Sequence, residues 1–286
     1  MLTINVTEDS EESRMLKRTY GGFIIASIMA ILFYFGGIVM NFGLMAISII
    51  AYHELVKAFH IRPEGESYCS LEVIGDGFVV FMYLLLLFKH EPVYFILSIV
   101  MVLTAFLVIF VIRFPKYESS KVAEAFFSVI YGPVMLSFIY QIRCLEHGQI
   151  FVWLVLCSSW ACDIFAYIIG MLFGKRKVFP LLSPKKSLAG CIGGVCGAAF
   201  AGALFGLSVF HHIADKGADC IWVFAVISAL GSIISQIGDL AASGIKRNHG
   251  IKDFGHLIPG HGGIMDRFDS VIVTAPIVYF LAVLFF

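Results

Sequence analysis

The chain has 286 residues, of which 59% are hydrophobic and 14% are charged, and its formal net charge is zero. A typical soluble domain is about 45–50% apolar and about 25% charged, so this composition excludes a water-soluble domain and indicates that lipid covers much of the surface. The seven cysteines include no C-x-x-C pair, which argues against a disulfide framework and against a zinc site.

Residues 1–20 form a polar segment that is first acidic and then basic. A secretory signal would begin basic and turn apolar before a cleavage site, so we expect a polar cytosolic tail and a first apolar helix that is retained. A transmembrane helix needs roughly 20 mostly apolar residues. This criterion predicts about nine spans, with boundaries good to a few residues, at 21–36, 39–59, 73–89, 93–113, 122–142, 149–174, 188–210, 219–245 and 267–286.

The connections between the predicted spans are short, and the chain contains no internal repeat. We therefore predict an all-α polytopic integral membrane protein, in which residues 21–286 form one transmembrane domain. Charged residues that suit a binding site are concentrated within 160–270, and we expect the functional site there.

The distribution of positive charge predicts the topology. When the spans alternate across the membrane, one side receives all of the 20 Lys and Arg residues except Lys89, Arg143 and Lys216. Loops rich in Lys and Arg stay in the cytosol, so we predict a cytosolic N-terminus and a C-terminus on the far side. The most basic loops, 174–187 and 246–267, then share the cytosolic face, where nucleotides are found.

The segment GDLAASGIKRNHGIKDFGHLIPGHGGIMDRFD, residues 238–269, joins the last two predicted spans. Asp239 and Ser243 are four residues apart, and Lys246 and Arg247 follow them. On a helix these side chains lie on or near one face. We expect that face to lie at the cytosolic end of the eighth span.

The rest of this segment adds more charge and a flexible loop. The loop contains Lys252, His261 and the pair Gly262 and Gly263, and glycines permit close approach of the backbone to a ligand. The last span then opens with three charged residues, Asp266, Arg267 and Asp269.

Several carboxylates and cations therefore meet at one membrane interface. Carboxylate oxygens suit Mg²⁺, and Lys and Arg bind phosphate oxygens, so the combination predicts metal-assisted phosphoryl or nucleotidyl transfer. A plainer interpretation is that Lys and Arg at helix ends only set topology, and that Asp253 and Asp269 cap or pair with neighbours. Asp239 is different, because an acid inside an apolar helix is costly and is a functional candidate by default.

This segment resembles the pattern that marks the phosphatidate cytidylyltransferases, also called CDP-diacylglycerol synthases. The positions that carry the resemblance are Ser243, Ile245, Lys246, Arg247, Lys252, Asp253, Gly255, Ile258, Pro259, His261, Gly262, Gly263, Ile264, Asp266, Arg267, Phe268 and Asp269. So many specified positions at the right spacing are a far more specific signal than a short motif.

A second segment supports the resemblance, which covers roughly residues 160–286. It is similar to the acidic helix and the S-P-K-K-[ST] loop of the same family at Asp163, Ala166, Tyr167, Phe173, Gly174, Lys175, Ser183, Pro184, Lys185, Lys186, Ser187 and Gly190. The loop offers hydroxyl and ammonium groups at the start of a helix, where backbone N–H groups favour phosphate. One departure is Ala189, which stands where the family usually has an acid or an amide.

The resemblance implies a function and its partners. The implied reaction transfers CMP from CTP to phosphatidic acid and gives CDP-diacylglycerol and pyrophosphate, with Mg²⁺ and also K⁺ as implied ions. It further implies a homodimer and no nucleic-acid partner. The motif forms resemble the eukaryotic branch, whereas the short chain and GDL at 238–240 look more bacterial, so an endoplasmic reticulum membrane is favoured over a bacterial plasma membrane.

We assign the candidate residues from these segments. The metal ligands are expected to be Asp239 and Asp266, supported by Asp163 and Asp269. Phosphates are expected to contact Lys246, Arg247, Lys252 and Arg267, while His261 either binds a phosphate or only orders the loop. The nucleotide or lipid phosphate is expected to contact Ser183, Lys185, Lys186, Ser187, Ser243, Gly262 and Gly263.

Three questions stay open in the sequence. Glu54 is either part of the site or a water-facing residue at a helix end. A CTP-dependent lipid-alcohol kinase, which would release CDP, is the alternative enzyme. A transporter is the alternative of another class, but it would place acidic residues along helices through the membrane centre, whereas these charges concentrate at one face.

Overall fold

The computed structural model describes residues 8–89, 91–209, 211, 213, 219–258 and 262–286, with side chains described from Gly21 onward apart from Asp219. The helices in chain order are α1 (Glu8–Phe35), α2 (Gly37–Ala58), α3 (Ser70–Phe88), α4 (Pro92–Ile112), α5 (Ser119–Val129), η1 (Ile130–Val134), α6 (Met135–Arg143), α7 (Gly148–Leu156), η2 (Cys157–Ala161), α8 (Cys162–Phe173), α9 (Leu188–Val209), α10 (Asp219–Asn248) and α11 (Met265–Phe285). The strands are β1 (Lys177–Phe179) and β2 (Ser183–Ser187).

Among the described residues, eight helical segments are long and apolar enough to cross a membrane, which confirms the all-α polytopic prediction. Two of them contain a π-helical stretch: α5, η1 and α6 form one span at Ser119–Arg143, and α7, η2 and α8 form another at Gly148–Phe173. The first predicted span corresponds to Gly21–Phe35, a shorter apolar stretch within α1. Because α1 begins at Glu8, it extends into the segment expected to be a tail.

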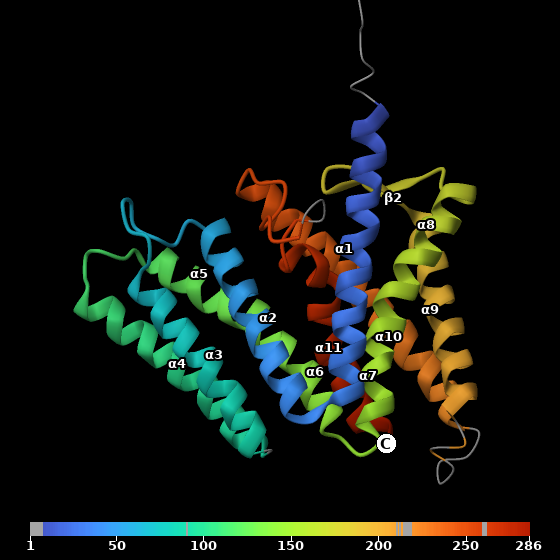
Figure 1. The fold of residues 1–286 in the computed structure, drawn as a ribbon, viewed down its shortest axis with the longest axis horizontal. Coiled ribbons are helices and arrows are strands. Elements are labelled where there is room, and N and C mark those ends of the chain that lie inside the picture. The colour runs from blue at the N-terminus through green and yellow to red at the C-terminus, as the bar shows by residue number, and fades with distance from the viewer. Residues whose placement is uncertain (1–7, 90, 210, 212, 214–218, 259–261) are drawn as a thin grey trace, which may run out of the picture.

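The helices form two inclined groups that diverge toward one end (Figure 1). Helices α2 to α5 lie in one group, α8, α9 and α10 lie in the other, and α11 lies between them behind α1 and α7. Helix α4 is the most exposed of the spans, because only 17% of its apolar stretch is buried inside the protein. Most of its side chains therefore face lipid.

Small residues allow the second group to pack closely. Helix α9 buries a stripe of glycines, and the space beside Gly197 is filled by the ring of Phe165 from α8. On the other side of α9, Gly202 lies against Ser228 and the Phe224 carbonyl of α10. Such small-residue contacts let membrane helices approach each other where lipid gives no hydrophobic driving force.

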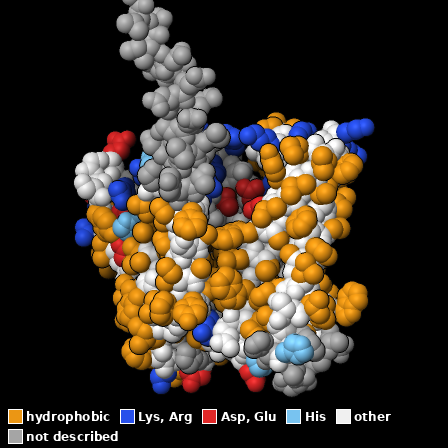
Figure 2. All heavy atoms as spheres, turned by 45° about the vertical axis from the view of Figure 1, so that its right-hand side comes forward, with side chains coloured by type: hydrophobic (Ala, Val, Ile, Leu, Met, Phe, Trp, Pro, Cys, Tyr) orange, Lys and Arg blue, Asp and Glu red, His pale blue; other side chains and the backbone are white. Residues whose placement is uncertain are grey.

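The connecting segments separate into two ends of the bundle. The α2–α3 and α4–α5 connections, the β hairpin and the α10–α11 connection lie at one end, together with the start of α1, while the C-terminus lies at the other (Figure 1). Lys and Arg side chains gather at the first end, above a band of apolar side chains, and acidic side chains lie in a hollow just beneath them (Figure 2). The basic loops therefore share one face, as the spacing of the spans predicts.

The basic loop after α8 contains a feature that the sequence pattern did not predict. Residues Lys177–Phe179 and Ser183–Ser187 pair as an antiparallel hairpin, with Lys177 opposite Ser187 and Phe179 opposite Ser183. The hairpin fixes the S-P-K-K-S residues as an extended strand directly before α9, and so holds its lysines at the edge of the acidic hollow.

Candidate active site

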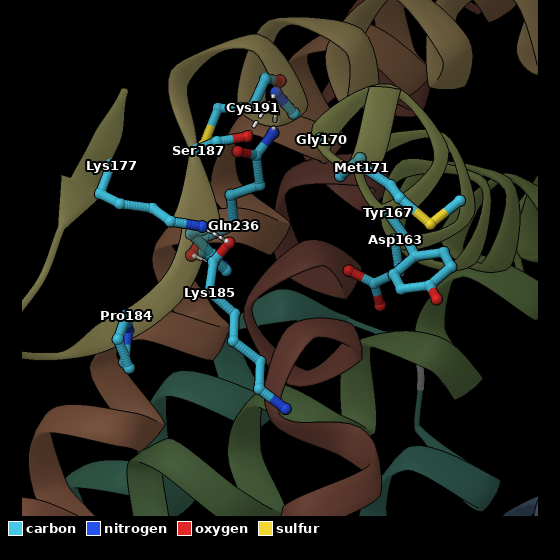
Figure 3. Close-up of a pocket in the computed structure, with 13 residues that line it drawn as sticks. Asp163, Tyr167, Gly170, Met171, Lys177, Pro184, Lys185, Ser187, Cys191 and Gln236 are labelled. Atoms are coloured by element: carbon cyan, nitrogen blue, oxygen red, sulfur yellow. Dashed lines mark hydrogen bonds between the residues drawn. The ribbon is translucent and has the colours of Figure 1, made fainter. Parts of the chain in front are cut away.

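A pocket of about 390 Å³ lies between α8, the β hairpin, α9 and α10. One wall carries Asp163 and Tyr167 from α8, and the facing wall carries Lys177 and Lys185 from the hairpin (Figure 3). The Asp163 carboxylate points into the pocket, toward the hairpin and Gln236 (Figure 3). The α8 part and the hairpin part of the second predicted segment thus line opposite sides of one cavity, and α10 contributes Gln236, one turn before Asp239.

Lys186 connects the hairpin to α10. Its Nζ lies 2.7 Å from Oδ2 of Asp239 and donates a hydrogen bond to the carbonyl of Gln236 at 3.3 Å. The side chains of Lys186 and Asp239 are 20% and 35% exposed, so the pair is reachable from water. An ion pair that is only partly desolvated can be exchanged for a ligand at low cost.

Three carboxylates interact electrostatically around this pair. Asp239 acts as a like charge on both Asp163 and Asp269, and Asp163 also acts on Asp269. Lys186 offsets the charge of Asp163, and Lys246 offsets that of Asp269. Acids from three different helices, α8, α10 and α11, therefore share one electrostatic site, and a cation placed among them would relieve their repulsion.

Asp266 lies in the first turn of α11 and organises the loop before it. Its Oδ1 accepts a hydrogen bond from Nζ of Lys246 at 2.8 Å. Its Oδ2 accepts from the backbone N–H of Phe254 at 2.8 Å and from that of Gly263 at 3.0 Å. The side chain is only 2% exposed, so these three donors are what keeps a buried carboxylate stable.

Glu54 of α2 holds the same loop from the other side. Its Oε1 accepts from the backbone N–H of Ile264 at 2.9 Å, and its Oε2 accepts from that of Met265 at 2.8 Å. These are N–H groups at the start of α11 that have no partner within the helix. Of the two interpretations of Glu54, the structure thus supports a part in building the site, and not a water-facing position, because the residue is 8% exposed.

Glycines make room for both carboxylates. A Cβ atom on Gly255 or on Gly263 would collide with the Glu54 carboxylate. Gly262 has a φ of 83°, and a Cβ there would lie 2.7 Å from Oδ2 of Asp266, so only glycine fits without strain. The glycines predicted to approach a ligand lie against two acidic side chains of the protein itself.

The remaining predicted residues are placed as follows. Ser187 is buried, and its Oγ accepts from the N–H of Gly190 at 3.2 Å, so it caps α9. Lys185 lines the pocket, whereas Ser183 begins β2 outside the lining. Ser243 is half-buried one turn beyond Asp239. Three predicted phosphate-binding residues are exposed and do not line the pocket, namely Arg247, Lys252 and Arg267. His261 lies outside the described residues.

Two further residues were missed by the sequence interpretation. Gln236 lines the pocket, and its Nε2 donates to the Cys191 carbonyl at 3.1 Å. A polar amide inside an apolar helix, one turn before Asp239, was the signal that could have found it. Tyr131 in η1 interacts electrostatically with Asp239 and Asp269, and its sequence context gave no such signal.

The carboxylates suggest a site for a divalent ion at which the protein supplies only some of the ligands. Among the described residues, no three His, Cys, Asp or Glu side chains lie close enough together to hold a metal ion by themselves. Mg²⁺ commonly binds through one or two carboxylates, waters and substrate phosphates. The acids of the hollow, Asp163, Asp239 and Asp269, fit that pattern.

Comparisons with known proteins identify the family of this chain. A match to the cytidylyltransferase family covers residues 16–285. A phosphatidate cytidylyltransferase of Rickettsia typhi is 37% identical over 162 residues, which is 56% of this chain and 71% of that protein.

Two other phosphatidate cytidylyltransferases show the same relationship. That of Rickettsia felis is 30% identical over 226 residues, or 79% of this chain and 96% of that protein. That of Staphylococcus saprophyticus is 32% identical over 168 residues, or 59% of this chain and 62% of that protein. Since the family match spans nearly the whole chain and includes every element of the acidic hollow, this protein belongs to the cytidylyltransferase family.

Proposed function

We propose that this protein transfers CMP from CTP to phosphatidic acid, forming CDP-diacylglycerol and releasing pyrophosphate. The observation that carries the proposal is the pocket lined by Asp163, Lys185 and Lys186, whose Lys186 pairs with Asp239, at the basic end of a membrane bundle. The names of the relatives, phosphatidate cytidylyltransferases, supply the substrate pair.

The chemistry needs alignment and charge neutralisation more than proton transfer. A phosphate oxygen of phosphatidic acid attacks the α-phosphorus of CTP, and the bond from that phosphorus to the bridging oxygen breaks, so that pyrophosphate leaves. The nucleophile is already an anion, and no strong protein base is required. Lys185 and Lys186 offer ammonium groups to the phosphates, on the rim that faces Asp163.

The two lysine–aspartate pairs suggest how the site changes when substrates bind. In the structure, Lys186 forms an ion pair with Asp239, and Lys246 forms one with Asp266. Each ammonium is also able to bind a phosphate oxygen. We infer that Lys186 turns from Asp239, which is 35% exposed, to the nucleotide, whereas Lys246 stays with Asp266, which is 2% exposed.

Mg²⁺ is the ion that we propose for the hollow, held by Asp239 together with Asp163 or Asp269. These carboxylates act on one another as like charges, and oxygen ligands are what Mg²⁺ prefers. When bound, the ion would neutralise the charge that builds on the transferring phosphate. K⁺ is a second ion that the family resemblance implies.

The lipid substrate needs a path from the bilayer. An apolar groove of about 390 Å³ runs between α9 and α10, lined by Ile192, Val195, Ile233, Ile237 and Leu240. It shares Cys191 and Gln236 with the active-site pocket. This arrangement supports a lipid whose phosphate enters the pocket while its acyl chains stay among apolar side chains.

We propose that the basic end faces the cytosol, whether the membrane is that of the endoplasmic reticulum or a bacterial plasma membrane. A homodimer is also proposed, on the family resemblance alone. The mass of the purified protein in detergent, measured by light scattering against 31.6 kDa for one chain, tests the dimer.

The position of the radioactive label in the products tests the reaction. Purified protein is incubated with Mg²⁺, phosphatidic acid in mixed micelles, and CTP labelled either on the α- or on the γ-phosphate. We expect α-label in the lipid product and γ-label in pyrophosphate. Omission of phosphatidic acid should abolish both.

Two results would contradict the proposal. Transfer of γ-label to a lipid, with release of CDP, would mean a lipid kinase. A protein that gives no lipid product, but carries solute across liposomes without consuming CTP, would mean a transporter.

A further inference from the structure

Tyr131 is a buried tyrosine whose hydroxyl has no hydrogen-bond partner among the described residues. The residue is 5% exposed and lies in η1, in the middle of the fifth predicted span. Its ring stacks on Phe127, with centroids 5.3 Å apart and planes at 18°. Packing therefore explains the ring, but nothing in the described protein explains the hydroxyl.

The backbone at Tyr131 is also unusual. η1 is a π-helical turn that contains Pro133, which cannot donate the regular helix hydrogen bond. Such turns inside α-helices occur frequently at functional sites. A second π-helical turn, η2, ends two residues before Asp163, so a widened turn also precedes one of the acids of the proposed site.

η1, which carries Tyr131, packs against α11, the helix that carries Asp269. Asp269 and Asp239 both act electrostatically on Tyr131, yet neither accepts its proton in a hydrogen bond. A second buried hydroxyl without a partner among the described residues, that of Ser235, lies one turn before Asp239 on α10. Buried hydroxyls normally find partners, so the Tyr131 hydroxyl is available to an acceptor oxygen of a bound substrate.

We propose that the Tyr131 hydroxyl donates a hydrogen bond to a phosphoryl oxygen of a substrate bound at Asp239 and Asp269. This inference rests on the proposed function, and it adds a substrate-binding residue from the N-terminal half of the chain. The oxygen belongs either to the triphosphate of CTP or to the phosphate of the lipid. The tyrosine keeps its proton, so it orients and stabilises the phosphate without breaking a bond.

Tyr131→Phe tests this directly, because it removes the hydroxyl and keeps the ring that stacks on Phe127. We expect the substrate-free protein to melt at the same temperature or higher, since an unpartnered buried hydroxyl does not stabilise the fold. Either the Kd for CTP, measured by equilibrium dialysis, or the KM for phosphatidic acid should rise about 10- to 100-fold. The substrate whose constant rises is the one whose phosphoryl oxygen accepts the hydrogen bond from Tyr131.

Tyr83→Phe is the matched control. Tyr83 is also fully buried, but its hydroxyl lies 2.8 Å from Oγ of Ser48, in a pair that is part of the α2–α3 packing. This variant should melt at a lower temperature and bind both substrates as the wild type does. The two variants should therefore affect stability and binding in opposite ways.

The inference fails if Tyr131→Phe leaves both constants unchanged, or if it lowers the melting temperature as Tyr83→Phe does. If the wild type makes CDP-diacylglycerol and Tyr131→Phe matches it, this inference alone is wrong. If the wild type makes no such product, the proposed function is wrong, and the CTP-binding measurement still decides whether Tyr131 contacts a phosphate.

Discussion

At the scale of single residues, Asp239 and Asp266 have different environments although each pairs with a lysine. Asp239 is 35% exposed and has one charged partner, whereas Asp266 is 2% exposed and accepts three hydrogen bonds that define the loop before α11. The first carboxylate is therefore available to a ligand through much of its surface. The second is primarily bound to the protein itself.

Asparagine substitutions should separate these roles. Asp239→Asn should reduce CDP-diacylglycerol formation to below about 1% of wild type, but change the free energy of unfolding by no more than about 1 kcal/mol, as for other exposed pairs. Asp266→Asn should also inactivate the protein, and should cost about 3–5 kcal/mol of stability because it breaks a buried charged pair.

Turnover with labelled CTP and thermal unfolding in detergent measure the two effects. Near wild-type turnover of Asp239→Asn would remove this residue from the metal site. Equal stability of the two variants would contradict the distinction between them.

At the scale of elements, the start of α11 depends on a contact between residues far apart in sequence. Glu54 accepts the N–H groups of Ile264 and Met265, and a side chain on Gly263 would occupy the space of its carboxylate. Helix α2 thereby fixes the position at which α11 begins, and with it the direction of Asp266 and Asp269. The N-terminal half of the chain is thus needed to shape a site whose motif lies in the C-terminal half.

Gly263→Ala should displace Glu54 and destabilise the protein by about 1.5–3 kcal/mol, the value of a hydrogen bond to a charged group. Turnover should fall together with stability, because the loop and Asp266 would move. Gly77→Ala is a suitable control, since Gly77 lies within α3 and an added Cβ meets no atom within 4 Å.

Alanine favours a helix over glycine by about 1 kcal/mol, so the control should melt at the same temperature as the wild type or higher. If Gly263→Ala were as stable as Gly77→Ala, the packing of Glu54 against the loop would not matter for the fold.

At the scale of the whole molecule, charge and shape agree on one functional end. The basic connections, the β hairpin and the acidic hollow lie together at the end where α1 begins, and the opposite end carries Lys89 and Arg143 as its described basic residues (Figures 1 and 2). Positive loops are retained in the cytosol. The proposed orientation thus presents the pocket to cytosolic CTP and its apolar groove to the bilayer.

Protease sites inserted in exposed loops should report this orientation. A site after Gly65, in the α2–α3 connection, should be cut only from the cytosolic side of sealed vesicles. A site after Glu146, in the α6–α7 connection, should be cut only from the other side. Both should be cut after detergent is added, and the reverse pattern in sealed vesicles would overturn the proposed topology.

The sequence by itself determined the membrane class, nearly all of the spans and the segments that hold the charged residues. Hydropathy over 20 residues is a local property, and so is the spacing of Asp239, Lys246 and Asp266. The sequence could not determine which acids face one another, because that depends on how α8, α10 and α11 pack.

Only the tertiary structure decided the roles of residues that act across the fold. It paired Lys186 with Asp239 and joined Glu54 to the start of α11 across 210 residues of sequence. It also packed η1, which carries Tyr131, against α11, the helix of Asp269. Contacts of this kind leave no periodic signal in the chain, since they arise where separate helices meet and not from the order of residues within one helix.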